Sequence, residues 1–218
     1  MITITEIVVT IILFAWIVVI VGPVTKKLYS YFLKKNMPVN KAIYYNRKVI
    51  HMAAGLAVLL APFFYSTPIL PFILSMAFAI LTYIPHRIGK LLCWFQTEEN
   101  MYEVHFCLMC GVVITLSWIV FNGNFWYGVI PVSFMAFGDA VTGIVRNMLY
   151  GYRTKSWYGN LAMLGVTLPI GALIGVPGII AAVVASFVEH FEFKGIDDNI
   201  IVPISSFITI LVLSSIFK

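Results

Sequence analysis

Residues 136–156 read Ala136-Phe-Gly-Asp-Ala-Val-Thr-Gly-Ile-Val-Arg-Asn-Met-Leu-Tyr-Gly-Tyr-Arg-Thr-Lys-Ser156, a polar segment in a strongly apolar chain. Asp139 closes an apolar run that begins near Phe125. An aspartate at the centre of a membrane helix costs about 2.5 to 3.5 kcal/mol on insertion scales, so such a residue usually has a function. Basic and hydroxyl side chains follow Asp139 closely. The segment therefore predicts a site for a phosphate group and its metal ion.

The composition outside this segment is that of a membrane protein. Of the 218 residues, 61% are hydrophobic and 11% are charged, and the mean hydropathy is +0.97. Soluble domains are about 25% charged, so we expect an all-α, polytopic membrane bundle that forms a single domain over residues 1–218. The net charge of +5 comes from loops between apolar spans. It therefore indicates topology and contact with membrane lipids, and no nucleic acid partner is expected.

Apolar windows of about 20 residues predict eight transmembrane helices. The seventh is short for a full span, so seven is the alternative count. The expected helices are 4–22, 49–65, 68–84, 104–121, 125–145, 160–176, 178–190 and 200–217.

The connections between these spans alternate strictly between charged and neutral. The charged ones are the basic 23–48, 85–103 and 146–159 and the acid-rich segment before the last span, and the neutral ones are 66–67, 122–124 and 176–177. The positive-inside rule places the basic loops in the cytoplasm and both termini outside. All of the candidate chemical groups then face the cytoplasm, where nucleotides are available.

Asp139, Thr142, Gly143 and Arg146 have i, i+3, i+4, i+7 spacing and share one helix face. Magnesium usually takes one or two carboxylates together with phosphate oxygens and waters, and this face could supply such a site. The alternative is an internal Asp139–Arg146 ion pair that only ties helices together. Two turns of spacing make that bridge awkward.

Two basic motifs are candidates for phosphate binding. Arg153-Thr154-Lys155-Ser156 lies between glycines that permit a tight loop around an anion, although a plain positive-inside loop has the same composition. Arg47-Lys48-Val-Ile-His51 opens the second span, with Arg47 and His51 one turn apart. The alternative for this pair of cations is an anchor that snorkels to the headgroups.

The segment 189–199 adds acids to a cytoplasmic loop, against the positive bias there. Glu189, Asp197, Asp198 and Asn199 offer oxygen ligands that suit a hard cation, and Asn199 is also a candidate cap for the last helix. The alternative is a solvated loop. Glu103, at the mouth of the fourth span, is expected to stabilise the N-terminus of that helix.

Taken together, these pieces resemble the polyprenol kinase family, which includes dolichol kinase, phytol kinase and CTP-dependent diacylglycerol kinase. The resemblance covers about 47–204, in the family's order. It rests on Arg47-Lys48-Val-Ile-His51-Met-Ala-Ala-Gly55, Gly138-Asp139, Arg153-Thr-Lys155-Ser-Trp-Tyr-Gly159, and Glu189 with Asp197-Asp198-Asn199-Ile-Ile-Val-Pro203.

The resemblance implies CTP as phosphoryl donor and a long-chain isoprenoid alcohol as acceptor. Which alcohol is used stays open among dolichol, geranylgeraniol, phytol and a diacylglycerol, and a homodimer is also left open. Two departures stand out, because many members have a glycine in place of Arg146 and an acid in place of Tyr158. Arg146 could add a phosphate contact, and Tyr158 removes a carboxylate.

The expected roles follow from what phosphoryl transfer needs, namely positioning and charge neutralisation. The expected Mg²⁺ ligands are Asp139, Asp197, Asp198 and Glu189. The expected catalytic residues are Asp139, Asp198 and His51, with Asp198 or His51 receiving the proton of the alcohol. The expected nucleotide-binding residues are Arg47, Lys48, Thr142, Arg146, Arg153, Thr154, Lys155, Ser156, Gly159 and Asn199.

Two other functions remain in competition. A CTP-dependent cytidylyltransferase that makes a CDP-lipid would need the same site but would release pyrophosphate. A small transporter would line a pathway with Asp139 and Arg146, and its charges would be spread over the membrane depth. In this sequence they gather on one side, and no strong internal repeat, the usual mark of such transporters, is present.

Overall fold

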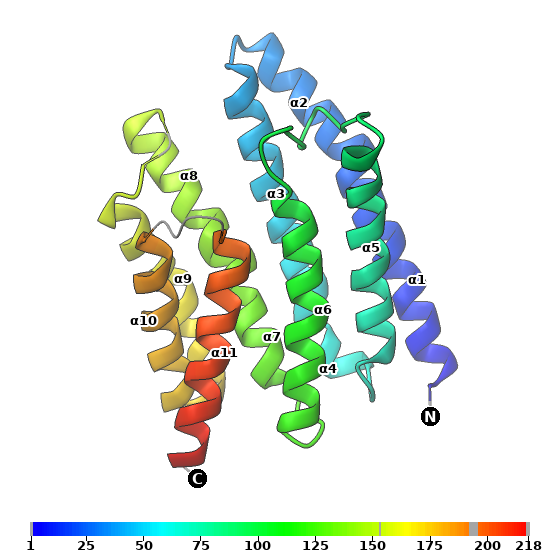
Figure 1. Cartoon of the computed structure of the whole chain (residues 1–218), viewed down its shortest axis with the longest axis vertical. Coiled ribbons are helices and arrows are strands. Elements are labelled where there is room, and N and C mark those ends of the chain that lie inside the picture. The colour runs from blue at the N-terminus through cyan, green and yellow to red at the C-terminus, as the bar shows by residue number, and fades with distance from the viewer. Residues whose placement is uncertain (1, 153, 192–195, 217–218) are drawn as a thin grey trace.

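The computed structural model describes residues 2–152, 154–191 and 196–216, and within them the chain forms helices and no strand (Figure 1). The helices are α1 (Ile4–Val19), α2 (Thr25–Lys34), α3 (Val39–Leu59), α4 (Ala61–Phe64), α5 (Ile69–Arg87), α6 (Tyr102–Val120), α7 (Trp126–Ser133), α8 (Asp139–Tyr150), α9 (Trp157–Gly171), α10 (Val176–His190) and α11 (Asp198–Ile216). Two π-helical turns, η1 (Ile20–Val24) and η2 (Phe134–Gly138), and one 3-10 turn, η3 (Ala172–Ile174), join neighbouring helices.

Eight helical rods stand side by side, and the N and C labels lie at the same end of the bundle (Figure 1). Seven rods in the described residues are long and apolar enough to cross a membrane, and α10, with 15 residues, is shorter. At 1.5 Å per residue α10 is about 22 Å long, less than the roughly 30 Å of a hydrocarbon core. The expected all-α, multi-pass membrane bundle is therefore confirmed.

The prediction of a basic loop over 23–48 is wrong, because most of that segment is helical. α1 continues through η1 into α2, and the wider π turn accommodates Pro23 without ending the helix. Lys26, Lys27 and Lys34 are exposed along α2, so the rod extends past its apolar part with a basic surface. α3 then begins at Val39, which leaves only a short turn between the two rods.

The same early start moves the first basic motif into a helix. Arg47, Lys48 and His51 were expected to open the second span, but they lie two to three turns inside α3. α3 packs closely on α8 because Gly143 has no side chain there. A Cβ at Gly143 would lie 1.9 Å from the hydroxyl of Tyr44 and 2.7 Å from Cε of Lys48. This close approach brings Lys48 to α8.

The rod α7–η2–α8 runs unbroken from Trp126 to Tyr150 through the most buried part of the bundle. The π turn η2 ends at Gly138, where a Cβ would lie 2.9 Å from Met163 of α9, and Asp139 follows directly. π turns inside α-helices often occur at functional sites. Arg146 also lies on this rod and is buried, so the expected loop over 146–159 begins only after Tyr150.

A buried acid–base centre between α3, α8, α10 and α11

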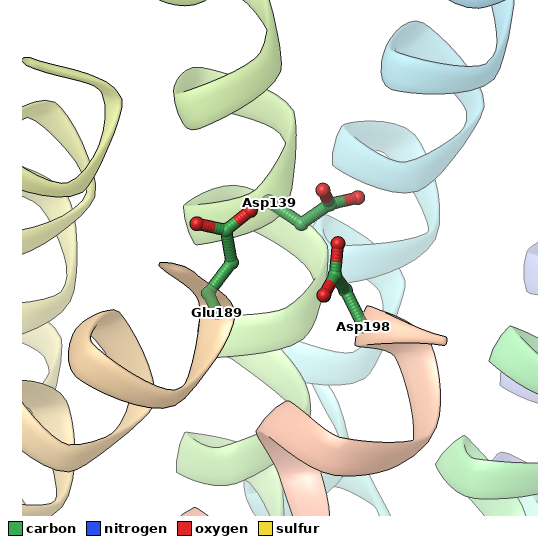
Figure 2. A group of neighbouring side chains, drawn as sticks. All are labelled: Asp139, Glu189 and Asp198. Atoms are coloured by element: carbon green, nitrogen blue, oxygen red, sulfur yellow. The ribbon is translucent and has the colours of Figure 1, made fainter. Parts of the chain in front are cut away.

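Three carboxylates from distant parts of the chain meet near one end of the bundle. Asp139 begins α8, Glu189 lies in the last turn of α10, and Asp198 begins α11 (Figure 2). One oxygen of each lies within 4.8 Å of one oxygen of the other two. The last turn of α10 and the first turn of α11 both bring their acids to Asp139 at the start of α8. Two buried acids and one half-buried acid so close together require compensating charge.

Arg146 compensates the most deeply buried acid, Glu189, which is 1% exposed. Its Nη1 and Nη2 each donate to one oxygen of Glu189 at 2.8 Å, a bidentate pair. Nη2 also donates to Oδ1 of Asn160 at 2.8 Å, and Nε donates to the main-chain oxygen of Ser156 at 3.0 Å. A Cβ at Gly159 would lie 2.4 Å from Nε of Arg146, so glycine is needed there. Arg146 therefore pairs with Glu189 across helices and not with Asp139.

Lys155, from the connection between α8 and α9, bridges two of the acids. Its Nζ donates to Oε1 of Glu189 at 2.9 Å and to both oxygens of Asp198 at 2.9 and 3.1 Å. Burial opposes the charge on Lys155, but the carboxylates of Glu189 and Asp198 outweigh burial and raise its pKa. Lys155 is therefore a cation wherever this site operates, and it holds α10 and α11 together.

Lys48 of α3 compensates the third acid. Its Nζ lies 2.6 Å from Oδ2 of Asp139, and Nδ1 of His51 lies 3.4 Å from the same oxygen. Nδ1 of His51 is buried and makes no hydrogen bond among the described residues. Between described residues, the hydrogen bonds to Asp139 go to Oδ2 and leave Oδ1 without one. Asp139 thus keeps one oxygen for a ligand.

The acid–base centre (Asp139, Glu189, Asp198, Lys48, Arg146 and Lys155) holds three acidic and three basic side chains. Both oxygens of Glu189 are fully engaged by Arg146, Lys155 and Asn160. Oδ1 of Asp139 accepts no hydrogen bond from the described residues, and Asp198 has the most exposed carboxylate of the three, with 26% of its side chain accessible. Asp139 and Asp198 therefore fit a hard cation such as Mg²⁺, provided that Lys155 turns away from Asp198.

The neighbouring residues Asp197 and Asn199 lie elsewhere. Asp197 pairs with Nδ1 of His105 on α6, and its Oδ1 accepts the main-chain N–H of Asn199 at 2.8 Å. The side chain of Asn199 donates to the main-chain oxygen of Tyr102 at 3.1 Å. Asp197, and not Asn199, is thus the cap of α11, and the structure brings Asp198 rather than Asp197 into the centre.

Other predicted site residues surround the centre without entering it. Arg47 turns toward α6, where it donates to Oδ1 of Asn100 at 3.3 Å and lies over the ring of Tyr102. The hydroxyl of Thr142 donates to the main-chain oxygen of Gly138, and Ser156 caps α9. Thr154 is half-buried. Arg153 and residues 192–195 lie outside the described residues, so their predicted roles are untested.

Glu103 is another buried acid, and the sequence predicted that it stabilises the N-terminus of its helix. Glu103 lies in the first turn of α6, but its Oε1 pairs with Nε2 of His86 at 2.6 Å and accepts from Nε2 of Gln96 at 2.8 Å. Its Oε2 is buried without a hydrogen-bond partner among the described residues. Sequence reasoning missed this cluster and also missed Asn160. The signal for Asn160 was an amide inside the apolar run that became α9.

Comparisons with known proteins give no match for this chain. No family model matches it, no curated protein matches it, and no solved structure matches it.

Proposed function

We propose that this protein is a CTP-dependent lipid kinase, which transfers the terminal phosphoryl group of CTP to the hydroxyl of an isoprenoid alcohol. The observation that carries the proposal is the meeting of Asp139, Glu189 and Asp198 within 4.8 Å, with Lys48, Arg146 and Lys155 around them. Phosphoryl transfer requires mainly positioning and charge neutralisation, and this centre offers cation ligands and phosphate-binding cations together. The choice of CTP and of an isoprenoid alcohol follows from the family resemblance of the motifs.

Each member of the centre has a distinct role in this proposal. Asp139 and Asp198 hold Mg²⁺, which neutralises the phosphate oxygens when it is bound. With Asp198 holding the metal, Lys155 would be free to pair with the phosphates. Arg146 and Asn160 fix Glu189, which keeps Lys155 within reach, so Glu189 and Arg146 are positioning residues.

The reaction forms one bond and breaks one. The alcohol oxygen bonds to the terminal phosphorus of CTP, and the bond from that phosphorus to the bridging oxygen breaks, which releases CDP. The proton of the alcohol passes to His51, whose Nδ1 is buried without a partner among the described residues. Asp198 is less well placed for that proton, because in this proposal its carboxylate is a ligand of Mg²⁺.

We place the centre on the cytoplasmic side of the membrane. The basic helix α2 lies at the opposite end of the bundle from the two termini (Figure 1). The positive-inside rule puts that end in the cytoplasm, where CTP is available, and puts both termini outside. The acid–base centre lies on the α2 side of the bundle because α10 ends and α11 begins there.

The test uses purified protein in detergent with Mg²⁺ and CTP labelled on its terminal phosphate. A panel of isoprenoid alcohols and diacylglycerol is offered, with ATP as control donor. We expect label to enter the lipid and CDP to be released. The Asp139→Asn variant should lose transfer by about 100-fold or more, as when a preorganised charge is removed from an active site. It should still purify as a folded membrane protein.

Two results would overturn the proposal. Full activity in Asp139→Asn would remove Asp139 from the metal site. Pyrophosphate release with a lipid phosphate, and no label transfer to any alcohol, would identify a cytidylyltransferase instead.

A further inference from the structure

A long apolar cavity lies between α1, α3, α5 and α6, beside the acid–base centre. The wall on α3 and α4 includes Ala54, Ala57, Val58 and Ala61, at i, i+3, i+4, i+7 spacing along that rod. Three of these four side chains are single methyl groups, which leave space where larger residues would fill the gap between helices. The cavity has a volume of about 120 Å³. A dry apolar cavity of this kind suits an apolar ligand.

One end of this cavity is polar and incomplete. His51 and Glu103 both line it, and the ring of His51 stacks on Phe106, one turn along α6 from Glu103, with centroids 4.3 Å apart. Nδ1 of His51 and Oε2 of Glu103 are buried without hydrogen-bond partners among the described residues. An unsatisfied buried polar atom costs about 1 to 3 kcal/mol, so a ligand that satisfies both would be stabilised here.

The other end of the cavity lies at Tyr65. The hydroxyl of Tyr65, which lines it, lies 2.9 Å from the hydroxyl of Thr10 on α1. From His51 to Ala61, the helical rod rises by about 15 Å at 1.5 Å per residue. The cavity therefore runs over about half of the roughly 30 Å thickness of a bilayer core.

We infer that this cavity holds the chain of the lipid acceptor, with the acceptor hydroxyl between His51 and Glu103. The inference rests on the proposed kinase function and adds the place of the acceptor and its class. A hydroxyl has a single proton to donate, so we infer that it donates to Oε2 of Glu103 when the alcohol binds and turns to donate to Nδ1 of His51 when the phosphoryl group is transferred. His51 also lies 3.4 Å from Asp139, so the hydroxyl sits at the edge of the acid–base centre.

The polar atoms of the cavity wall favour an isoprenoid alcohol over diacylglycerol. The hydroxyl of Ser75 donates to the main-chain oxygen of Cys107, and that of Thr82 donates to the main-chain oxygen of Phe78. Tyr65 is engaged with Thr10. The ester carbonyls of diacylglycerol would therefore be buried without donors, at the cost of unsatisfied acceptors. A chain whose only polar group is its hydroxyl avoids that cost.

The test compares two phenylalanine substitutions on adjacent residues of α3. Ala57→Phe fills the cavity, whereas Leu56→Phe lies on the surface, where Leu56 is 52% exposed. We expect Ala57→Phe to lower kcat/KM for a long isoprenoid alcohol by about tenfold or more, since pocket fit is worth that much per group. Leu56→Phe should match the unsubstituted protein. Equal activity in all three would overturn the inference.

A second measurement needs neither catalysis nor a substituted protein. A fifteen-carbon isoprenoid alcohol with a photoreactive diazirine at its apolar end is irradiated with the unsubstituted protein, without nucleotide, and the adducts are mapped by mass spectrometry. We expect adducts on Tyr65 or Ile114, which line the end of the cavity away from His51. Excess unlabelled alcohol should abolish these adducts. Exposed Cys93 lies outside the cavity and serves as the control for surface labelling.

The outcomes separate the inference from the function on which it rests. Phosphoryl transfer with adducts confined to the outer surface overturns the cavity and leaves the kinase standing. Saturable labelling of the cavity without transfer from CTP to any alcohol overturns the kinase and supports the cavity as a lipid site.

Discussion

Among the buried glutamates of the bundle, Glu189 and Glu103 have different surroundings. Glu189, in the acid–base centre, receives hydrogen bonds at both oxygens from Arg146, Lys155 and Asn160. Glu103, between α5 and α6, uses one oxygen for His86 and Gln96 and keeps Oε2 without a partner among the described residues. Both are almost completely buried, at 1% and 6% exposure.

The difference separates atoms that hold the fold from atoms that await a ligand. A fully satisfied carboxylate is strongly tied to its neighbours, and removing one partner leaves an uncompensated buried charge. An unsatisfied one keeps free capacity at the expense of stability. Within the acid–base centre the same contrast recurs between Glu189 and Asp139, whose Oδ1 has no hydrogen bond from the described residues. Substitutions at these positions should therefore act on different properties.

The largest effect is expected on stability, from Arg146→Met. The change leaves Glu189 buried beside only Lys155 and Asn160, and breaking a buried pair in this way costs about 3 to 5 kcal/mol. Thermal unfolding in detergent should show a large fall in Tm. The double variant Arg146→Met with Glu189→Leu removes both charges and should recover much of the loss. An unchanged Tm in the single variant would contradict the closed network.

The next effect is on activity, and it distinguishes two adjacent acids. Asp198→Asn should lower kcat by about 100-fold and raise the Mg²⁺ concentration needed, because it removes a proposed metal ligand and charge in the active site. Asp197→Asn should cost about 1 kcal/mol or less of stability through the weakened cap of α11 and should leave kcat almost unchanged. Rate measurements over a Mg²⁺ titration compare the two. If Asp197→Asn had the larger effect on kcat, the assignment would be reversed.

The membrane class of the fold and most of the chemical groups could be predicted from the sequence. Hydropathy predicts the spans because a helix in lipid must form all of its backbone hydrogen bonds internally. Asp139 could be singled out because a carboxylate in an apolar run is costly without partners. Sequence could not choose between Asp197 and Asp198. Successive residues of a helix point about 100° apart, so the choice depends on how α11 is rotated, and packing against α6 and α10 decides that.

The sequence also could not predict which charged residues pair with one another. Arg146 was considered with Asp139 because they share a helix, but the bond it makes is to Glu189, 43 residues away. The helix boundaries at the basic segments were wrong for a related reason. Lysines on α2 indicate where apolar surface ends, and a helix can continue past that point with its charges in solvent. The cavity could not be predicted from the sequence, because Ala54 and Ala57 form a cavity wall only when other helices face them.

The smallest expected effect is at Glu103, and it sharpens the contrast between the two glutamates. Glu103→Gln keeps an oxygen for His86 and Gln96 but places an NH₂ group where Oε2 would accept from the acceptor hydroxyl. Losing one such hydrogen bond costs about 1 kcal/mol, so KM for the alcohol should rise about fivefold with kcat and Tm nearly unchanged. Steady-state kinetics over a range of alcohol concentrations measure this shift. Ser75→Ala is the matched control on the same cavity wall, because its hydroxyl is already donated to Cys107. An equal rise in KM in both variants would mean that Oε2 of Glu103 has no special part in binding the alcohol.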